Sequence, residues 1–223
     1  MAVNGANSVE EKVRDHFHDD AERFDAIYGE KKGAFQKFID NYWRGVVQKR
    51  LKINVETLKP LEGKKILDVG CGSGRFCIAF ALNGADKVIG IDFAQAMIEI
   101  ADKLATEAGV EDKCEFVIGG FPEAISDDDG PFEACTANGF FDYVEHPVPI
   151  ITRMRELTRG KLIMSFPKAI EWRVPIRRVR FWLKGTPLFL YNEAQVRDIM
   201  TRSGVTDYKI IFLDRDYLVV ANV

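Results

Sequence analysis

The sequence predicts an α/β protein with a doubly wound, mostly parallel sheet that helices cover on both faces. Two observations predict this class. From Lys64 onward, short apolar runs alternate with stretches of helical spacing, and a glycine-rich turn separates the first run from the helix that follows it. The last two apolar runs are too close together for a parallel return, so the sheet should end in an antiparallel hairpin.

Two amphipathic helices are expected before the sheet begins. Apolar or half-apolar side chains recur on one helical face from Val9 to Tyr28, and again from Phe35 to Val47. Each helix needs a surface to cover its apolar stripe. We therefore expect residues 9–60 to form an N-terminal helical cap or lid, and residues 1–8 to be disordered.

Five apolar runs predict the parallel strands. The first lies in the segment KKILDVG, which starts at Lys64 and breaks into glycines. The stretches between the runs are long enough to hold the helices that connect parallel strands. The other four candidate strands are Lys87 to Ile91, Cys114 to Ile118, Glu133 to Asn138 and Lys161 to Ser165.

The end of the chain predicts a capped helix and then a hairpin. Asn192, with Gln195 three residues later, is typical of a capping box, and Gly204 is a stop signal. Two strand-like runs follow, YKIIFL and YLVVANV, and only residues 214–216 join them. A connection this short makes an antiparallel hairpin. We expect residues 61–223 to form one domain.

Composition limits the kinds of partner. A chain of 223 residues, of which 47% are hydrophobic, can bury a core without disulfides. Its 31 basic and 34 acidic residues give no general electrostatic reason to bind nucleic acid. The four cysteines form no CxxC pair or metal-spaced cluster, so we expect reduced core thiols and no metal. With no leader and no membrane span visible, a cytoplasmic protein is expected.

The most specific signal is the motif DVGCGSG, residues 68–74, placed between a strand and a helix. Its glycines let backbone N–H groups approach a ligand closely. The dinucleotide fingerprint needs its third glycine at position 75, which is Arg75, so a nicotinamide-dependent dehydrogenase is the least favoured interpretation. Asp68 suits a ligand ammonium group better than a phosphate, and Asp92, after the next strand, is placed to accept hydrogen bonds from ribose hydroxyls.

Residues 65–74, KILDVGCGSG, together with Asp92 in GIDFA, resemble the class I S-adenosylmethionine-dependent methyltransferases. The resemblance extends over residues 64–223 in the order of strands and helices. It implies a Rossmann-like sheet of seven strands with an antiparallel last strand, and S-adenosylmethionine as the cofactor. The cofactor-binding residues that it implies are Asp68, Gly70, Cys71, Gly72, Gly74, Asp92, Phe93, Met97, Gly120, Phe121 and Asn138.

The resemblance also assigns parts of the cofactor to parts of the chain. It places Asp68, Gly70 and Gly72 against the methionine moiety. Phe93 and Met97 would border the adenine, whose edge the backbone near Gly120 and Phe121 would reach.

Two positions depart from the family pattern. Gly120 stands where an acidic residue often contacts the adenine amino group, and Phe141-Asp142-Tyr143 stands where many members have Leu-Glu-His, so no histidine base is carried over.

A methyltransferase of this kind mainly aligns its acceptor with the activated methyl group. An acceptor that must lose a proton would need a base, for which Tyr28, Tyr143, Tyr191 and His146 are the groups expected near the pocket. A surface or capping role is favoured for His146, which precedes a proline. The candidate catalytic residues are Tyr28, Tyr143, His146 and Asn138.

Residues 168–184 form a basic segment with six basic residues and one acidic residue, and with tryptophan and phenylalanine interleaved. Two interpretations stay open. It is either a surface helix with snorkelling side chains, or part of an acceptor-side insertion over residues 168–190 that binds an anionic small molecule. Membrane-surface docking and RNA binding are weaker options. The candidate acceptor-binding residues are Phe141, Trp172, Arg173, Arg177 and Tyr191.

The predicted function is methyl transfer to a small-molecule acceptor by a monomer or homodimer. Two alternatives stay open. The chain could consume S-adenosylmethionine as a cyclase or lyase that releases methylthioadenosine, since Asn138 follows the fourth strand and the family's base motif is missing. It could also be a non-catalytic module that binds the cofactor or a partner.

Overall fold

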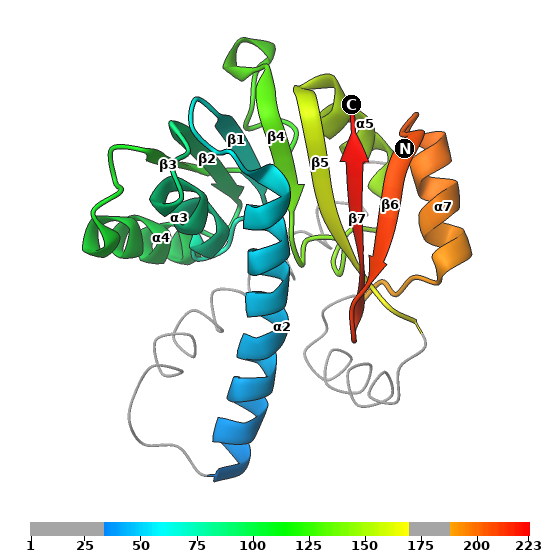
Figure 1. Ribbon diagram of the computed structural model, residues 1–223, viewed down its shortest axis with the longest axis horizontal. Helices are drawn as coiled ribbons and strands as arrows, with labels where there is room; N and C mark the ends of the chain where they lie inside the picture. Colours follow the sequence, from blue (N-terminus) through cyan, green and yellow to red (C-terminus); the bar gives the residue numbers. More distant parts are fainter. Residues whose placement is uncertain (1–33, 170–187) are drawn as a thin grey trace, which may run out of the picture.

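The computed structural model describes residues 34–169 and 188–223 (Figure 1). Four candidate site residues lie outside this part of the chain, namely Tyr28, Trp172, Arg173 and Arg177. The helix predicted from Val9 to Tyr28 lies outside it as well. None of the described helices is both long and apolar enough to cross a membrane.

Seven strands form one sheet in the order β3-β2-β1-β4-β5-β7-β6. The first five are parallel, whereas β7 lies antiparallel between β5 and β6. This confirms the predicted seven-stranded sheet with an antiparallel last strand. The strands are β1 (Lys65–Val69), β2 (Lys87–Asp92), β3 (Cys114–Ile118), β4 (Phe132–Ala137), β5 (Thr158–Pro167), β6 (Asp207–Phe212) and β7 (Asp216–Asn222).

The helices follow the strands in the alternation that the sequence predicts. The capping box at the start of α7 is confirmed: the Asn192 side chain accepts a hydrogen bond from the Gln195 N–H at 2.9 Å, and the Gln195 side chain accepts one from the Asn192 N–H at 2.8 Å. The described helices are α2 (Ala34–Leu58), α3 (Arg75–Leu82), α4 (Gln95–Ala108), α5 (Pro147–Glu156), α7 (Glu193–Arg202) and the short 3-10 helix η1 (Asp127–Asp129).

The sheet has a hydrophobic core on each face. Because side chains alternate along a strand, Ile66 of β1 packs into the core that α2, α3 and α4 cover. Leu67 and Val69 of the same strand point to the other face and pack into the core that α5 and α7 cover. Helices on both faces confirm the doubly wound arrangement.

The helix predicted from Phe35 to Val47 is part of a longer one. Helix α2 runs to Leu58, because Leu51, Val55 and Leu58 continue the apolar stripe and pack onto the core beside α3. Leu58 is 1% exposed. In Figure 1 the N-terminal half of α2 extends past the edge of the sheet at which the parallel strands end. The C-terminal part of α2 is therefore built into the core, and the rest reaches beyond the strand ends.

Candidate functional site

The topology reverses between β1 and β4, which are neighbours in the sheet although β2 and β3 lie between them in the sequence. In open α/β sheets, ligands bind outside the carboxyl ends of the strands at such a point. The structure brings candidate residues from four strand ends to this edge. They are Asp68 near the end of β1, the glycine turn that follows β1, Asp92 at the end of β2, Gly120 after β3 and Asn138 after β4.

The three glycines of the turn have positive φ angles of 68°, 53° and 70° at Gly70, Gly72 and Gly74. A Cβ atom at Gly70 would lie 2.5 Å from Phe140, and one at Gly74 would lie 2.8 Å from Phe116. These two glycines are therefore required by the packing of the protein itself. At Gly72, by contrast, no atom lies within 4 Å of the Cβ position, so the turn faces open space there.

Asp92 holds the turn from the neighbouring strand. Its Oδ2 accepts a hydrogen bond from the Gly72 N–H, and its Oδ1 accepts one from the Ala94 N–H, both at 2.9 Å. Burial raises the pKa of Asp92, and hydrogen bonds from the backbone N–H groups of Ala94, Gly72 and Phe93 oppose that shift. A carboxylate has about four acceptor sites, so Asp92 can still accept hydrogen bonds from a ligand on the turn.

Asp68 lies two residues before Gly70 and is 1% exposed. Its Oδ1 accepts a hydrogen bond from the Thr136 hydroxyl at 2.5 Å, and its Oδ2 lies 3.7 Å from the Cys77 thiol, which donates to it. Burial raises the pKa of Asp68 to about 7. A positive charge near such a carboxyl group favours the ionised form, so this position suits a cationic ligand better than a phosphate.

The cysteines beside the turn are buried thiols. Cys71 is 7% exposed and Cys77 is fully buried, and burial raises the pKa of the Cys77 thiol. The predicted reduced state agrees with their place in the core, since both are free. The backbone N–H of Cys71 donates to the Ile91 carbonyl at 2.9 Å, which ties the turn to β2.

The residues expected around an adenine lie just beyond Asp92. Phe93 is half-buried and packs with Met97, which is 2% exposed, in a small apolar cluster at the start of α4. Gly120 is exposed, whereas the ring of Phe121 packs into the core. The structure thus brings Phe93, Met97 and the Gly120 backbone to the same edge, with Phe121 turned inward.

Asn138, Tyr143 and His146 lie in the segment between β4 and α5. Asn138 and Tyr143 are half-buried. His146 is exposed at the N-cap position of α5, where its side chain makes no capping hydrogen bond. Of these three side chains, only Asn138 lies directly at a strand end of the sheet.

The structure places Phe141 and Tyr191 in the core rather than on a surface open to an acceptor. Phe141 is 0% exposed and stacks on Phe166 with ring centroids 4.7 Å apart. The Tyr191 hydroxyl donates to the carbonyls of Phe141 and Val144 at 3.3 and 3.1 Å. Both aromatic rings therefore stabilise the segment that follows β4.

Lys168 is the first residue of the basic segment, directly follows β5 and packs against the β6–β7 hairpin. Its Nζ donates to the Leu213 carbonyl and lies 5.7 and 5.3 Å from the ring centroids of Phe212 and Tyr217. This cation therefore has partners within the protein and is not offered to an acceptor.

Comparison with known families identifies the family of the chain. The sequence matches the family model described as "Methyltransferase domain" over residues 60–181, which is more than half of the chain. The chain belongs to this methyltransferase family. The matched range contains the glycine turn, Asp92 and Asn138, so the site described above lies inside the methyltransferase domain.

The relatives include the ubiquinone biosynthesis O-methyltransferase of Maricaulis maris, which is 30% identical over 164 residues, or 66% of this chain and 61% of that protein. The protein of the same name from Alkalilimnicola ehrlichii is 34% identical over 119 residues, 52% of this chain and 47% of its own. The methyltransferase chain spans 42 to 61% of the length of the curated relatives compared.

Solved structures share the fold. The magnesium protoporphyrin IX methyltransferase of Synechocystis PCC 6803 with bound SAH has a TM-score of 0.74 and 22% identity, over 94% of this chain and 97% of that one. The same enzyme with bound SAM has a TM-score of 0.71 and 21% identity, over 96% of each chain. The likeness covers nearly the whole length of the methyltransferase chain.

The donor set of this methyltransferase domain fits S-adenosylmethionine. The space over Gly72 allows close approach of a ligand to the backbone. Asp92 keeps acceptor capacity for hydroxyl groups, and Asp68 supplies a carboxyl group whose ionised form a cation favours. A phosphate-bearing dinucleotide would meet two carboxylates at this edge instead.

Three residues of the site gave no signal in the sequence. Thr136 holds Asp68, while Asn54 and Arg50 of α2 reach the end of β4 and the hairpin. Their partners lie 68, 84 and 166 residues away along the chain. Contacts between residues this far apart in the sequence form only when the sheet has formed. No local sequence pattern can therefore predict them.

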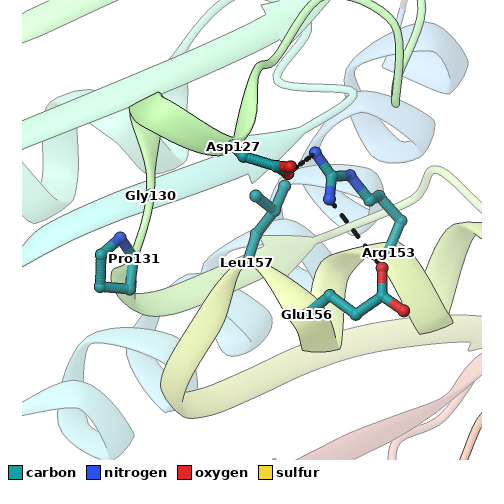
Figure 2. Close-up of a pocket in the computed structure, with 6 residues that line it drawn as sticks. All are labelled: Asp127, Gly130, Pro131, Arg153, Glu156 and Leu157. Atoms are coloured by element: carbon teal, nitrogen blue, oxygen red, sulfur yellow. Dashed lines mark ion pairs between the residues drawn. The ribbon is translucent and has the colours of Figure 1, made fainter.

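A depression of about 430 Å3 lies at the opposite edge of the sheet, where β4 and β5 begin (Figure 2). Arg153 in it forms ion pairs with Asp127 at 2.6 Å and with Glu156 at 3.9 Å. Its charged groups are thus paired with one another, and it lies away from the glycine turn. The lining residues are Asp127, Gly130, Pro131, Arg153, Glu156 and Leu157.

Proposed function

We propose that this protein binds S-adenosylmethionine on the glycine turn and transfers the methyl group to an oxygen atom of a small-molecule acceptor. The observation that carries the proposal is the open space over Gly72, next to a carboxylate that already holds the Gly72 N–H, in a chain of the methyltransferase family. The relatives named as O-methyltransferases support oxygen as the methylated atom.

The described residues have distinct tasks in this proposal. Asp92 accepts hydrogen bonds from the ribose hydroxyls, and Asp68 supplies negative charge near the methionine part. Phe93 and Met97 border the adenine. When bound, the cofactor supplies a methyl group on a positively charged sulfur. The protein then contributes by holding the acceptor in line and excluding water, which can lower a barrier by about 7 kcal/mol or more.

We propose an acceptor whose oxygen is already anionic, such as a carboxylate, because it needs no base. Among the candidate catalytic residues of the segment after β4, Asn138 carries no titratable group, His146 is exposed and Tyr143 is half-buried. The basic segment supports an anionic acceptor, and Arg173 and Arg177 remain predictions as its binding residues. Trp172 remains a predicted contact in the same segment.

For a hydroxyl acceptor, Tyr28, Tyr143 and His146 remain the predicted candidates for proton removal. We also propose that residues 9–60 form a cap over the site. The course of α2 past the strand ends supports that role (Figure 1).

The test uses S-adenosylmethionine labelled on the methyl group, incubated with the protein and fractionated small-molecule extracts. We expect label to move to an organic product only in the presence of extract, with one S-adenosylhomocysteine formed per methyl transferred. A methyl ester releases the label as methanol in mild base, whereas a methyl ether does not, so base treatment tests the carboxylate acceptor. Methylthioadenosine formed from cofactor alone would instead support the cyclase or lyase alternative.

A further inference from the structure

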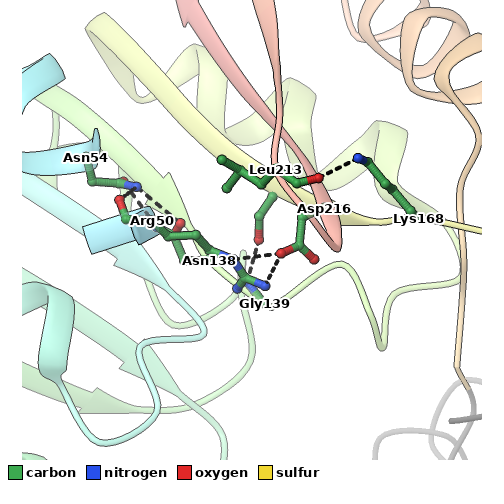
Figure 3. A network of polar contacts seen from close by, with 8 residues as sticks. Arg50, Asn54, Asn138, Gly139, Lys168, Leu213 and Asp216 are labelled. Atoms are coloured by element: carbon green, nitrogen blue, oxygen red, sulfur yellow. Dashed lines mark hydrogen bonds and ion pairs between the residues drawn. The ribbon is translucent and has the colours of Figure 1, made fainter. Parts of the chain in front are cut away.

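Two asparagine side chains join helix α2 to the end of β4 at the candidate site. Asn54 of α2 is 0% exposed, and Asn138 directly follows β4. The Nδ2 of Asn54 donates to the Oδ1 of Asn138 at 3.3 Å, and the Nδ2 of Asn138 donates to the Oδ1 of Asn54 at 3.2 Å (Figure 3). The two amides thus face each other in a reciprocal pair.

A third contact fixes the orientation of this pair. The Nδ2 of Asn54 also donates to the Arg50 carbonyl at 2.8 Å. A carbonyl can only accept, so the nitrogen of the Asn54 amide must face it and the amide cannot be turned over. The Oδ1 of Asn54 therefore faces Asn138, and the Nδ2 of Asn138 must donate to it. One N–H of Asn138 is used in this way, and the second makes no hydrogen bond within residues 34–169 and 188–223, so it can donate to another acceptor.

Asn138 lies at the rim of the glycine turn. The segment after β4 covers the turn, since a Cβ atom at Gly70 would lie 2.5 Å from the Phe140 ring. Two residues before Asn138, Thr136 pairs in register with Asp68 and donates to its carboxyl group. The amide of Asn138 therefore lies next to the residues that we expect to meet the methionine part of the cofactor.

The same helix is anchored on the other side of Asn138. The guanidinium of Arg50, 9% exposed, donates to the Oδ2 of Asp216 at 3.0 Å from Nε and at 2.5 Å from one terminal nitrogen. It lies over Gly139, where a Cβ atom would come within 3.4 Å of it. The Gly139 N–H in turn donates to the Ser165 hydroxyl at 2.8 Å. Helix α2, the segment after β4 and the hairpin are thus joined at one point.

We infer that Asn54 is a positioning residue for cofactor binding. It holds the Asn138 amide in the one orientation that leaves an N–H free for the cofactor on the glycine turn. The ion pair between Arg50 and Asp216 holds α2 against the sheet, so that the Asn54 side chain can contact the Asn138 amide. Binding of the cofactor and seating of α2 are then coupled through one amide contact, and each stabilises the other. This inference rests on the proposed function.

A double-mutant cycle tests it, with the dissociation constant of S-adenosylhomocysteine measured by calorimetry. The proteins are the wild type, Asn54→Leu, Asn138→Ala and the double variant. Leucine fills nearly the same space as asparagine, and the Arg50 carbonyl keeps its backbone hydrogen bond in the helix, so Asn54→Leu should fold. We expect Asn54→Leu to weaken binding about tenfold, the effect of roughly one hydrogen bond to a charged group, when Asn138 is present. It should change binding less than about twofold when Asn138 is already alanine.

An NMR readout separates positioning from general stability. The side-chain amide signals of Asn138, assigned by their loss in Asn138→Ala, should shift when the wild type is saturated with S-adenosylhomocysteine, and should shift by a smaller amount when Asn54→Leu is saturated. Lys49→Ala is the matched control on the same helix. It removes only the exposed ion pair with Asp214, so affinity should stay at the wild-type value.

The outcomes are distinguishable. Equal weakening by Asn54→Leu in both backgrounds would show a merely structural role, and no weakening in either would show no role. Either result overturns the inference while the proposed function stands. A folded wild-type protein that binds no S-adenosylhomocysteine overturns both.

Discussion

At the scale of single residues, Asp68 is a carboxyl group whose ionisation depends strongly on the fold. It is 1% exposed, its neighbours in the structure are a hydroxyl and a thiol, and burial raises its pKa from the ordinary 3.8 to about 7. Between these two values the folded protein holds a proton that the unfolded chain has lost. The contribution of Asp68 to the free energy of unfolding therefore falls as the pH rises from about 4 to about 7.

Replacing Asp68 by asparagine should remove this loss. The asparagine side chain imitates the protonated carboxyl group at every pH, so we expect Asp68→Asn to unfold at a temperature close to the wild type near pH 4.5. It should be more stable than the wild type at pH 8, by on the order of a few kcal/mol. Thermal unfolding between pH 4.5 and 8 measures the difference.

The exposed Asp128 provides the control. Asp128→Asn should leave the pH dependence of unfolding as it is in the wild type. A difference between Asp68→Asn and the wild type that is constant across this pH range would show that Asp68 does not titrate near 7.

At the scale of structural elements, the glycine turn needs its three glycines for two different reasons. Packing against Phe140 and Phe116 excludes a side chain at Gly70 and at Gly74. Gly72 has a positive φ of 53° but no neighbour, so only backbone strain and a ligand would oppose a side chain there. Gly109, after α4, matches this situation with a φ of 68° and open space, but it is remote from the candidate site.

Alanine variants of Gly72 and Gly109 should therefore lose similar stability but differ in their affinity for the ligand. Alanine at either position should lower the free energy of unfolding by about 1–2 kcal/mol, the cost of a left-handed backbone for an L-residue. Only Gly72→Ala should also weaken the binding of S-adenosylhomocysteine, by about tenfold or more, because its methyl group enters the space of the ligand. Equal affinity of the two variants would show that the ligand does not bind on the glycine turn.

The seating of α2 depends on a buried ion pair between Arg50 and Asp216, whose side chains are 11% and 3% exposed. Asp216→Ala leaves the Arg50 charge buried without this partner and should lower the free energy of unfolding by about 3–5 kcal/mol. Asp214→Ala removes only the exposed pair with Lys49 and should cost at most about 1 kcal/mol. Urea unfolding measures both. Similar costs for the two variants would mean that α2 is held mainly by its apolar contacts.

At the scale of the whole molecule, the fold could be predicted because its signals are local. The five parallel strands, the capping box at Asn192 and the short hairpin connection each occupy a few consecutive residues. The order of the elements then leaves few ways to build the sheet. The glycine turn and Asp92 could be predicted for the same reason, since strand ends carry them to one edge.

The rest of the site could not be predicted, because it depends on packing between distant segments. Phe141 and Tyr191 were expected in an acceptor pocket, yet the segment after β4 turns them into the core, where Phe166 fills the space between them. Asn54 showed no motif, since its partner Asn138 lies 84 residues away. Residue type alone does not predict which side chains make contacts between segments that are far apart in the sequence.

The central claim is that S-adenosylmethionine binds on the glycine turn next to Asp92. A calorimetric titration of S-adenosylmethionine and S-adenosylhomocysteine into the wild-type protein and into Asp92→Ala tests it most directly. We predict one site per chain for both ligands in the wild type, and binding at least about tenfold weaker in Asp92→Ala, the loss of hydrogen bonds to a charged acceptor. No binding of either ligand to the folded wild type, or unchanged affinity in Asp92→Ala, would contradict the account.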